Sequence, residues 1–149
     1  MKQLLIIITI ILIPFTILAT VAEKKVTDLE TGSLTINVTG FETSDGEARI
    51  ALINSKTDYD EGNNYREKKV PVKEKKVQCT IENLEFGEYG VKVFHDENSN
   101  GELDTAMFGI PKEAYGFSNN ARSTFGPPKY SKVVFKFESS DQEIFIKIK

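Results

Sequence analysis

Apolar and polar residues alternate one for one in several short runs of this chain, and that alternation constrains the fold more than any other feature. Side chains on a β-strand point to opposite faces in turn, so strict alternation is typical of a strand with one buried face. The clearest run, Tyr89–Val93, begins just after a turn at Gly87. Similar runs occupy residues 34–38, 48–53, 70–72, 77–81, 133–137 and 144–148. No helical period follows the apolar leader of the chain, which predicts an all-β fold.

Seven short strands separated by turn residues predict a seven-stranded antiparallel β-sandwich. The segment Thr43–Gly46 is rich in turn residues and would join the first two strands as a hairpin. Pro71 has no backbone N–H and therefore indicates an edge strand. Cys79 is the only cysteine, so no internal disulfide can form. Its place in the alternation predicts a small, inward-facing apolar side chain.

The first 22 residues have the composition of a secretory signal peptide. Lys2 is followed by nineteen uncharged, mostly apolar residues that end in small residues, the last of them Ala22. We therefore expect residues 1–22 to be a signal peptide and residues 23–149 to be a single domain, periplasmic or secreted after export. An uncleaved membrane anchor is the alternative, because nineteen residues nearly reach the roughly 20 that a spanning helix needs.

The charge of the exported domain argues against two classes of partner. Removal of Lys2 with the leader leaves 18 basic and 22 acidic residues, a net charge of −4. Nucleic-acid and anionic-membrane binding both need a basic surface. We therefore predict no nucleic-acid partner and, after signal cleavage, no membrane partner. A small polar ligand or a protein partner stays open.

The longest stretch without alternation runs from His95 to Pro128 and is 34 residues long. Connections of this length are uncommon in compact domains and are usually functional or disordered. Its aromatic content argues against disorder, which is typical of segments poor in large apolar residues. The sequence therefore predicts one long ordered loop, and that loop is the expected seat of function.

Three apolar residues fall on strand faces that the alternation assigns to solvent. They are Phe94, Val134 and Phe145. Contiguous exposed apolar patches are rare on monomers, so a cover is expected if their strands are neighbours. The second half of the long loop could supply it through Phe117 and Phe125. A partner subunit, in an assembly that uses this outer face, is the alternative.

The start of the loop has the spacing of a calcium-binding loop. Oxygen-bearing side chains stand at positions 1, 3, 5 and 9, glycine at position 6, and the position-7 carbonyl belongs to Glu102. The candidate metal ligands are Asp96, Asn98, Asn100, Glu102 and Asp104. Position 12 is Met107, so the bidentate carboxylate is missing, and any calcium binding is expected to be weak. A plain tight turn, in which these side chains cap their own backbone, is equally compatible with the spacing.

The loop residues could also be arranged as a catalytic site or a zinc site. A hydrolase or carbohydrate-processing enzyme would need paired carboxylates, such as Asp96 with Asp104 or Glu113, facing each other across a cleft. His95 is the only histidine, so a zinc site lacks the ligands it normally takes. No nucleophile-elbow sequence accompanies Ser118 or Ser123. We therefore expect no enzyme activity, and a hydrogen-bonding role for His95 at a strand end.

The second half of the loop holds a candidate site for a sugar or small polar ligand. Its residues are Tyr115, Asn119, Asn120 and Arg122. Aromatic rings can stack on such a ligand, and amide and guanidinium groups can orient it. The alternative is a self-packed Ω-loop whose asparagines hydrogen-bond its own backbone.

Two runs of sequence resemble a known family. They are GFETSDGEARIALINS, residues 40–55, and VFHDENSNGELDTAMFGIPKEAYGFSNNARSTFGPP, residues 93–128. The pattern Leu84-x-x-Gly87-x-Tyr89 is similar to that of transthyretin-like, prealbumin-like domains. The longer runs resemble the secreted bacterial family known as domain of unknown function 2141. The resemblance implies an exported β-sandwich of transthyretin-like or immunoglobulin-like type, and it implies no activity. We expect an exported, non-enzymatic binding or structural module.

Overall fold

The computed structural model describes residues 30–149, so the predicted signal peptide lies outside the described residues. The strands are β1 (Thr31–Thr39), β2 (Glu47–Ile53), β3 (Arg66–Pro71), β4 (Lys76–Glu85), β5 (Gly87–Asp96), β6 (Tyr115–Phe117), β7 (Phe135–Phe137) and β8 (Asp141–Lys147). Two short α-helices, α1 (Lys56–Glu61) and α2 (Tyr130–Val133), and two 3-10 turns, η1 (Met107–Gly109) and η2 (Ser118–Asn120), lie between them. No helix within these residues has the length and apolar character needed to cross a membrane.

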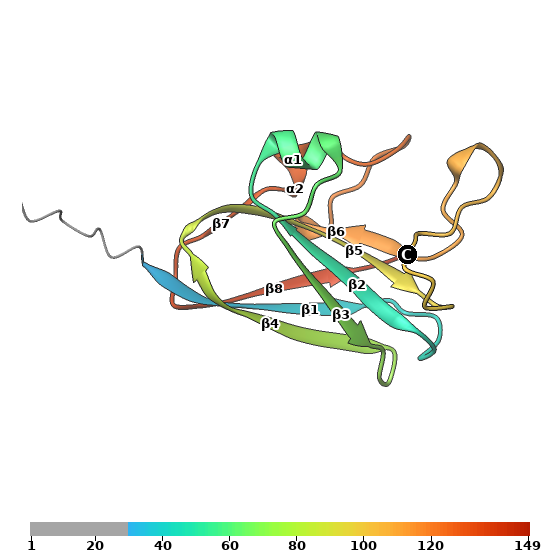
Figure 1. The fold of residues 1–149 in the computed structure, drawn as a ribbon, viewed down its shortest axis with the longest axis horizontal. Coiled ribbons are helices and arrows are strands. Elements are labelled where there is room, and N and C mark those ends of the chain that lie inside the picture. The colour runs from blue at the N-terminus through green and yellow to red at the C-terminus, as the bar shows by residue number, and fades with distance from the viewer. Residues whose placement is uncertain (1–29) are drawn as a thin grey trace, which may run out of the picture.

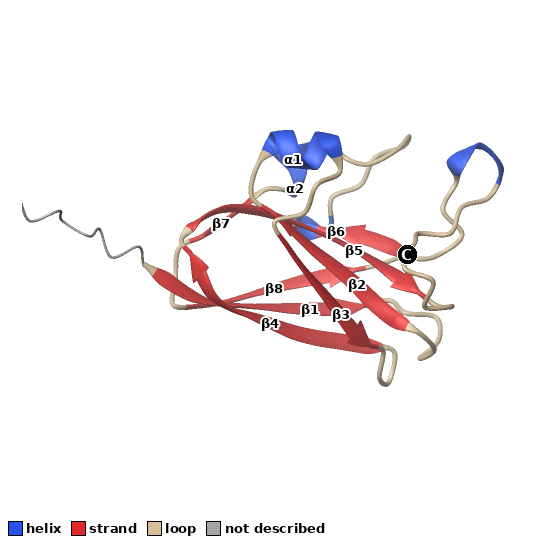
Figure 2. Ribbon diagram, viewed as in Figure 1, coloured by secondary structure: helices blue, strands red, loops and turns tan. Residues whose placement is uncertain are grey.

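The strands form two sheets that face each other (Figures 1 and 2). One sheet has the order β4-β1-β8, and the other has the order β3-β2-β5-β6, with β7 also paired to β5. The expected β-sandwich is therefore confirmed as an all-β, two-sheet architecture. β3, which contains Pro71, lies at the edge of its sheet as predicted.

The described residues contain eight strands, not the predicted seven. The additional strand is β6, a three-residue segment inside the long loop that pairs with β5. Three residues are too few to show a period of two. The helices were also missed, although α1 has a side-chain N-cap at Ser55 and a left-handed C-cap at Gly62. A helix of six residues is too short to display a helical period.

Two predictions of strand pairing were wrong. The first two strands do not form a hairpin, because β1 pairs with β4 and β8 whereas β2 pairs with β3 and β5 in the other sheet. The sandwich is also not purely antiparallel, because β1 and β8 run parallel. Alternation shows which face of a strand is buried, but it carries no information on which strands are neighbours. The turn at residues 43–46 therefore crosses between sheets.

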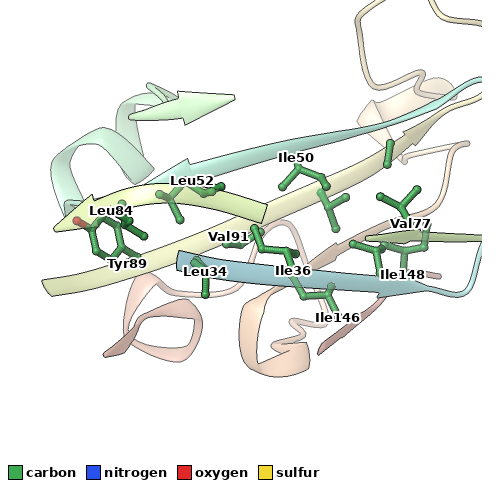
Figure 3. Packing of buried hydrophobic residues seen from close by; sticks show 14 of the residues in the cluster. Leu34, Ile36, Ile50, Leu52, Val77, Leu84, Tyr89, Val91, Ile146 and Ile148 are labelled. Atoms are coloured by element: carbon green, nitrogen blue, oxygen red, sulfur yellow. The ribbon is translucent and has the colours of Figure 1, made fainter. Parts of the chain in front are cut away.

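The core lies between the two sheets and is built from the inward-facing residues of both (Figure 3). Leu34 and Ile36 of β1 face Ile50 and Leu52 of β2, and Val91 of β5 lies among them. Cys79 packs partly buried against this core from β4, as its parity predicted. Burial raises the pKa of its thiol, and Lys68 opposes that effect more weakly.

Helices cover the outer face of the five-stranded sheet at one end only. There α1 and α2 lie over the sheet, and a second cluster of buried residues joins Phe117, Ala121 and Val133, with Tyr59 packed against them (Figure 1). Phe117 was predicted to cover the outward apolar residues, but it belongs to β6 and is itself buried beneath this layer. Phe125 does not act as a cover either, because it is 90% exposed.

Phe94 and Phe145 lie in different sheets and form no common patch. Phe94 belongs to β5 and is half-buried, whereas Phe145 belongs to β8 and is 66% exposed. Val134, the third of the outward apolar residues, follows directly after α2 and is half-buried. The single apolar outer face that an assembly subunit would have used is therefore divided between two sheets.

Ser118 fastens the covering layer to the sheet. Its side chain is 1% exposed, and its Oγ accepts a hydrogen bond from the N–H of Val91 at 2.9 Å. The same hydroxyl donates to the carbonyl oxygen of Val133 at 2.6 Å. One buried hydroxyl thus satisfies a backbone donor of β5 and a backbone acceptor of α2.

Replacement of Ser118 by alanine is expected to lower the free energy of unfolding by about 1–3 kcal/mol, because it leaves the buried N–H of Val91 without a partner, while the carbonyl of Val133 keeps a hydrogen bond from Asn119. Urea unfolding of residues 23–149 measures the change. Ser123→Ala, which alters an exposed serine of the same loop, is the control and should change stability by less than about 0.5 kcal/mol. Equal effects of the two substitutions would contradict this role of Ser118.

Candidate functional site

The segment from Asp96 to Asp104 forms a compact turn closed by its own side chains. Asp96 is fully buried, and its Oδ1 accepts a hydrogen bond from the N–H of Asn100 at 3.0 Å. Its Oδ2 accepts from the N–H of Gly101 at 2.9 Å. The amide groups of Asn98 and Asn100 donate to the two carboxylate oxygens of Asp104 at 2.8 and 3.2 Å. The oxygens that were predicted to converge on an ion therefore converge on N–H groups.

A cation from a strand that is distant in the sequence already pairs with the buried carboxylate of this turn. The Nε of Arg49, on β2, lies 3.0 Å from Asp96 Oδ2 and 2.8 Å from a carboxylate oxygen of Glu47. Gly101 makes room for the guanidinium, because a Cβ at that position would lie 3.1 Å from Arg49 Nη2. Both oxygens of Asp96 are therefore occupied, one of them by a positive charge.

Glu113 and His95 hold the base of the loop. The carboxylate of Glu113 accepts the N–H of Glu97 at 3.0 Å and the N–H of Asp104 at 2.9 Å. His95 is fully buried, and its Nε2 donates to the carbonyl oxygen of Asp45 at 2.8 Å. Its Nδ1 lies 3.3 Å from a carboxylate oxygen of Glu97 but makes no hydrogen bond of acceptable geometry among residues 30–149. These contacts join the loop to the end of β5 and to the turn before β2.

The predicted metal ligands lie in this turn, where Glu102 was predicted to contribute only its backbone carbonyl. Glu102 is exposed, and its N–H donates to Asn100 Oδ1 at 2.8 Å. Within residues 30–149, no group of three or more His, Cys, Asp or Glu side chains has the spacing to hold a metal ion. A carboxylate bound to a guanidinium is a poor calcium ligand because the guanidinium repels the ion. The donor set therefore fits a turn better than a calcium cage.

The predicted polar-ligand residues are divided between two roles. Asn119 donates to backbone carbonyls of residues 132–134 at 2.9–3.2 Å, and Asn120 bonds the backbone of β8 through both its side-chain atoms. Arg122 donates to the carbonyl oxygens of Tyr115 at 3.0 Å and Lys147 at 2.6 Å. These three side chains are thus engaged in holding the backbone. Tyr115 alone faces an open space.

That space is a groove of about 340 Å³ on the outer face of the five-stranded sheet. Two rows of outward-facing side chains cross the strands beneath it. The first row runs Lys69, Arg49, Phe94, Tyr115, and the second runs Glu67, Ala51, Lys92, Phe117. Gly101 and Leu103 of the loop border the groove. The volume lies within the range of small-molecule sites.

Basic side chains outnumber acidic ones along the groove although the chain as a whole is acidic, and one of them, Arg49, is also paired with Asp96 and Glu47. Three basic side chains, Arg49, Lys69 and Lys92, and one carboxylate, Glu67, face it, whereas the whole chain carries a net charge of −3. Burial lowers the pKa of Lys92, and the nearby Glu67 opposes that shift. The only hydrogen bond of Lys92 Nζ within the described residues goes to the carbonyl of Gly62 at 3.5 Å. A partly buried ammonium group with so little compensation favours an anionic ligand.

Sequence analysis missed most of the groove residues. Phe94 was recognised as an outward apolar residue, but Arg49, Lys69 and Lys92 were not singled out. Each of these basic residues occupies a polar position of an alternating strand, and such positions ordinarily face solvent, so none of them indicated a site. Only the pairing of β2 with β3 and β5 brings them together.

The sequence profile of a bacterial family described as "Uncharacterized protein conserved in bacteria (DUF2141)" matches residues 36–145, which include all the groove residues. No curated protein and no solved structure matches the chain. The transthyretin-like or immunoglobulin-like type of the sandwich therefore stays a prediction.

Removal of the Arg49 cation should be costly. Arg49→Met leaves the buried Asp96 carboxylate without its charged partner, so we expect the free energy of unfolding of residues 23–149 to fall by about 3 kcal/mol in urea unfolding. Glu47→Gln is the matched control, because it removes the other, more exposed carboxylate of the same arginine and should cost less than about 1 kcal/mol. A loss for Glu47→Gln as large as that for Arg49→Met would contradict a dominant Arg49–Asp96 pair.

Proposed function

This chain belongs to the uncharacterized bacterial family DUF2141, and we propose that it is an exported, non-enzymatic binding module whose ligand site is the groove over β2, β5 and β6. The observation that carries the proposal is the groove itself. It is a concave site with rings and basic side chains, of which Lys92 has a single long hydrogen bond and Arg49 is paired through its Nε only, on a sheet face that helices cover at one end. Export rests on the composition of the leader, with its apolar run after Lys2.

The state of the carboxylates supports binding rather than hydrolysis. A glycosidase needs two carboxyl groups facing each other across an open cleft. Here Glu113 binds two backbone N–H groups and Asp96 binds Arg49 and two more. Asp104 accepts the amides of Asn98 and Asn100. Each of these carboxylates therefore has a structural use that a catalytic role would compete with.

A serine–histidine pair also receives no support from the geometry. Ser118 bonds to Val91, four positions before His95 on β5, and His95 directs its Nε2 to the carbonyl of Asp45. Ser123 is exposed in the loop beyond η2.

Filling the groove tests the proposal. Ala51 lies at its floor, so Ala51→Leu should remove the space without disturbing the core, which is on the other face of β2. We expect a panel of small polar compounds to shift backbone amide signals of residues lining the groove, in NMR spectra of residues 23–149, a chain that contains both sheets complete. Ala51→Leu should abolish these shifts.

Thr80→Leu is the control, since it adds the same side chain to an exposed strand position in the other sheet. It should leave the shifts unchanged. Shifts confined to residues 96–104 or 119–122, or shifts that survive Ala51→Leu, would be evidence against the groove as the ligand site.

Calcium binding at Asp96–Asp104 is the second candidate, favoured by the spacing of the turn and by the clustering of Asn98, Asn100 and Asp104. Calcium would have to compete with Arg49 for Asp96. We therefore expect the thermal midpoint of residues 23–149 to be the same in millimolar calcium and in chelator. A rise of several degrees that disappears in Asp104→Ala would instead establish the ion site, because a ligand at about ten times its dissociation constant stabilises by about 1.4 kcal/mol.

A further inference from the structure

Four outward side chains on β2 and β5 form a square at the centre of the groove. Arg49 lies directly opposite Phe94, and Ala51 lies directly opposite Lys92. The two cations are therefore diagonal neighbours, with Cα atoms about 7–8 Å apart. At the fourth corner Ala51 contributes only a methyl group. The floor between the two cations is consequently open.

Part of the hydrogen-bonding capacity at this square is not used by the protein, because Lys92 Nζ makes only one hydrogen bond among residues 30–149, to the carbonyl of Gly62 at 3.5 Å. The Nε edge of Arg49 is taken by Asp96 and Glu47, but neither Nη group has a partner among residues 30–149, and neither is buried. A guanidinium presents its two Nη groups side by side, which is the geometry that binds a planar carboxylate through two hydrogen bonds. Lys92 adds a second positive charge from the other strand.

Rings line the groove beside the cations. Phe94 stands next to both Arg49 and Lys92, and Tyr115 lies directly opposite Phe94 on β6. Both rings are half-buried and face the groove. Flat apolar faces of this kind bind sugar rings and aromatic rings by stacking.

We propose that the groove binds a carboxylate attached to a ring, with the carboxylate over Ala51 between Arg49 and Lys92 and the ring against Phe94 and Tyr115. This inference rests on the proposed function, because it names the ligand class of the same groove. Acidic sugars and aromatic acids share this chemistry. A groove of about 340 Å³ is large enough for either, since it lies at the lower end of the range of small-molecule sites.

Titration of residues 23–149 with three probes tests the inference. The probes are glucuronate, phenylacetate and glucose, followed by calorimetry and by backbone amide shifts. We expect at least one carboxylate to bind at least tenfold more tightly than neutral glucose and to shift signals of Arg49, Lys92 and Phe94. Preference for glucuronate identifies an acidic-sugar site, and preference for phenylacetate identifies an aromatic-acid site.

Lys92→Met is the decisive variant, because it keeps an unbranched side chain of similar length and removes the charge. It should weaken carboxylate binding at least tenfold and leave the thermal midpoint nearly unchanged. Lys136→Met, at an exposed position of β7, is the matched control and should leave the affinity as it was.

The outcomes separate the two proposals. If glucose binds the groove as tightly as glucuronate and phenylacetate, or if Lys92→Met does not weaken either carboxylate, the ligand class is wrong and the groove stands as a binding site. If no probe, and no compound of the wider panel, shifts a groove signal, both proposals fail.

Discussion

The pair between Arg49 and Asp96 is the interaction on which the functional face depends. It joins β2 to the last residue of β5, and the guanidinium of Arg49 lies against Gly101 of the long loop. Asp96 is fully buried, so its charge requires that partner. The pair fixes the loop at the open end of the outer sheet face. The same arginine then presents its two Nη groups to the groove, so one residue holds the border of the site and supplies part of its charge.

The groove exists because the outer face of the five-stranded sheet is covered unequally. At one end α1, α2 and η2 bury Phe117 and Val133, and Ser118 bonds this layer to β5. At the other end the loop is held over the sheet by Arg49. Between them Ala51 offers no side chain to fill the space. The covering helices at one end and the loop at the other, with Ala51 between them, make this sheet face concave.

Small residues also allow the two sheets to meet beside the groove. A Cβ on Gly116 of β6 would lie 3.1 Å from side-chain atoms of both Ile146 and Ile148. The neighbouring Tyr115 exchanges backbone hydrogen bonds with Lys149 at 3.1 and 3.2 Å. The strand that presents Tyr115 to the groove is therefore bonded to both sheets, which makes its position well defined.

The sequence was sufficient to predict the elements with a strong period of two, and insufficient to predict which strands are neighbours. The inward parity of Tyr89, Val91 and Val93 was correct because it is a local property, and the edge position of β3 was correct because Pro71 lacks a backbone N–H for a second neighbouring strand. The hairpin of β1 with β2 was wrong, and the groove was not predicted, since both depend on which strands are neighbours.

The same limit applies to the Asp96–Asp104 turn. Its spacing places carboxylate and amide oxygens around one point, and backbone N–H groups need such oxygens as much as a cation does. What favours the plain turn is Arg49, which lies 47 residues away in the chain and becomes a neighbour only through the pairing of β2 with β5.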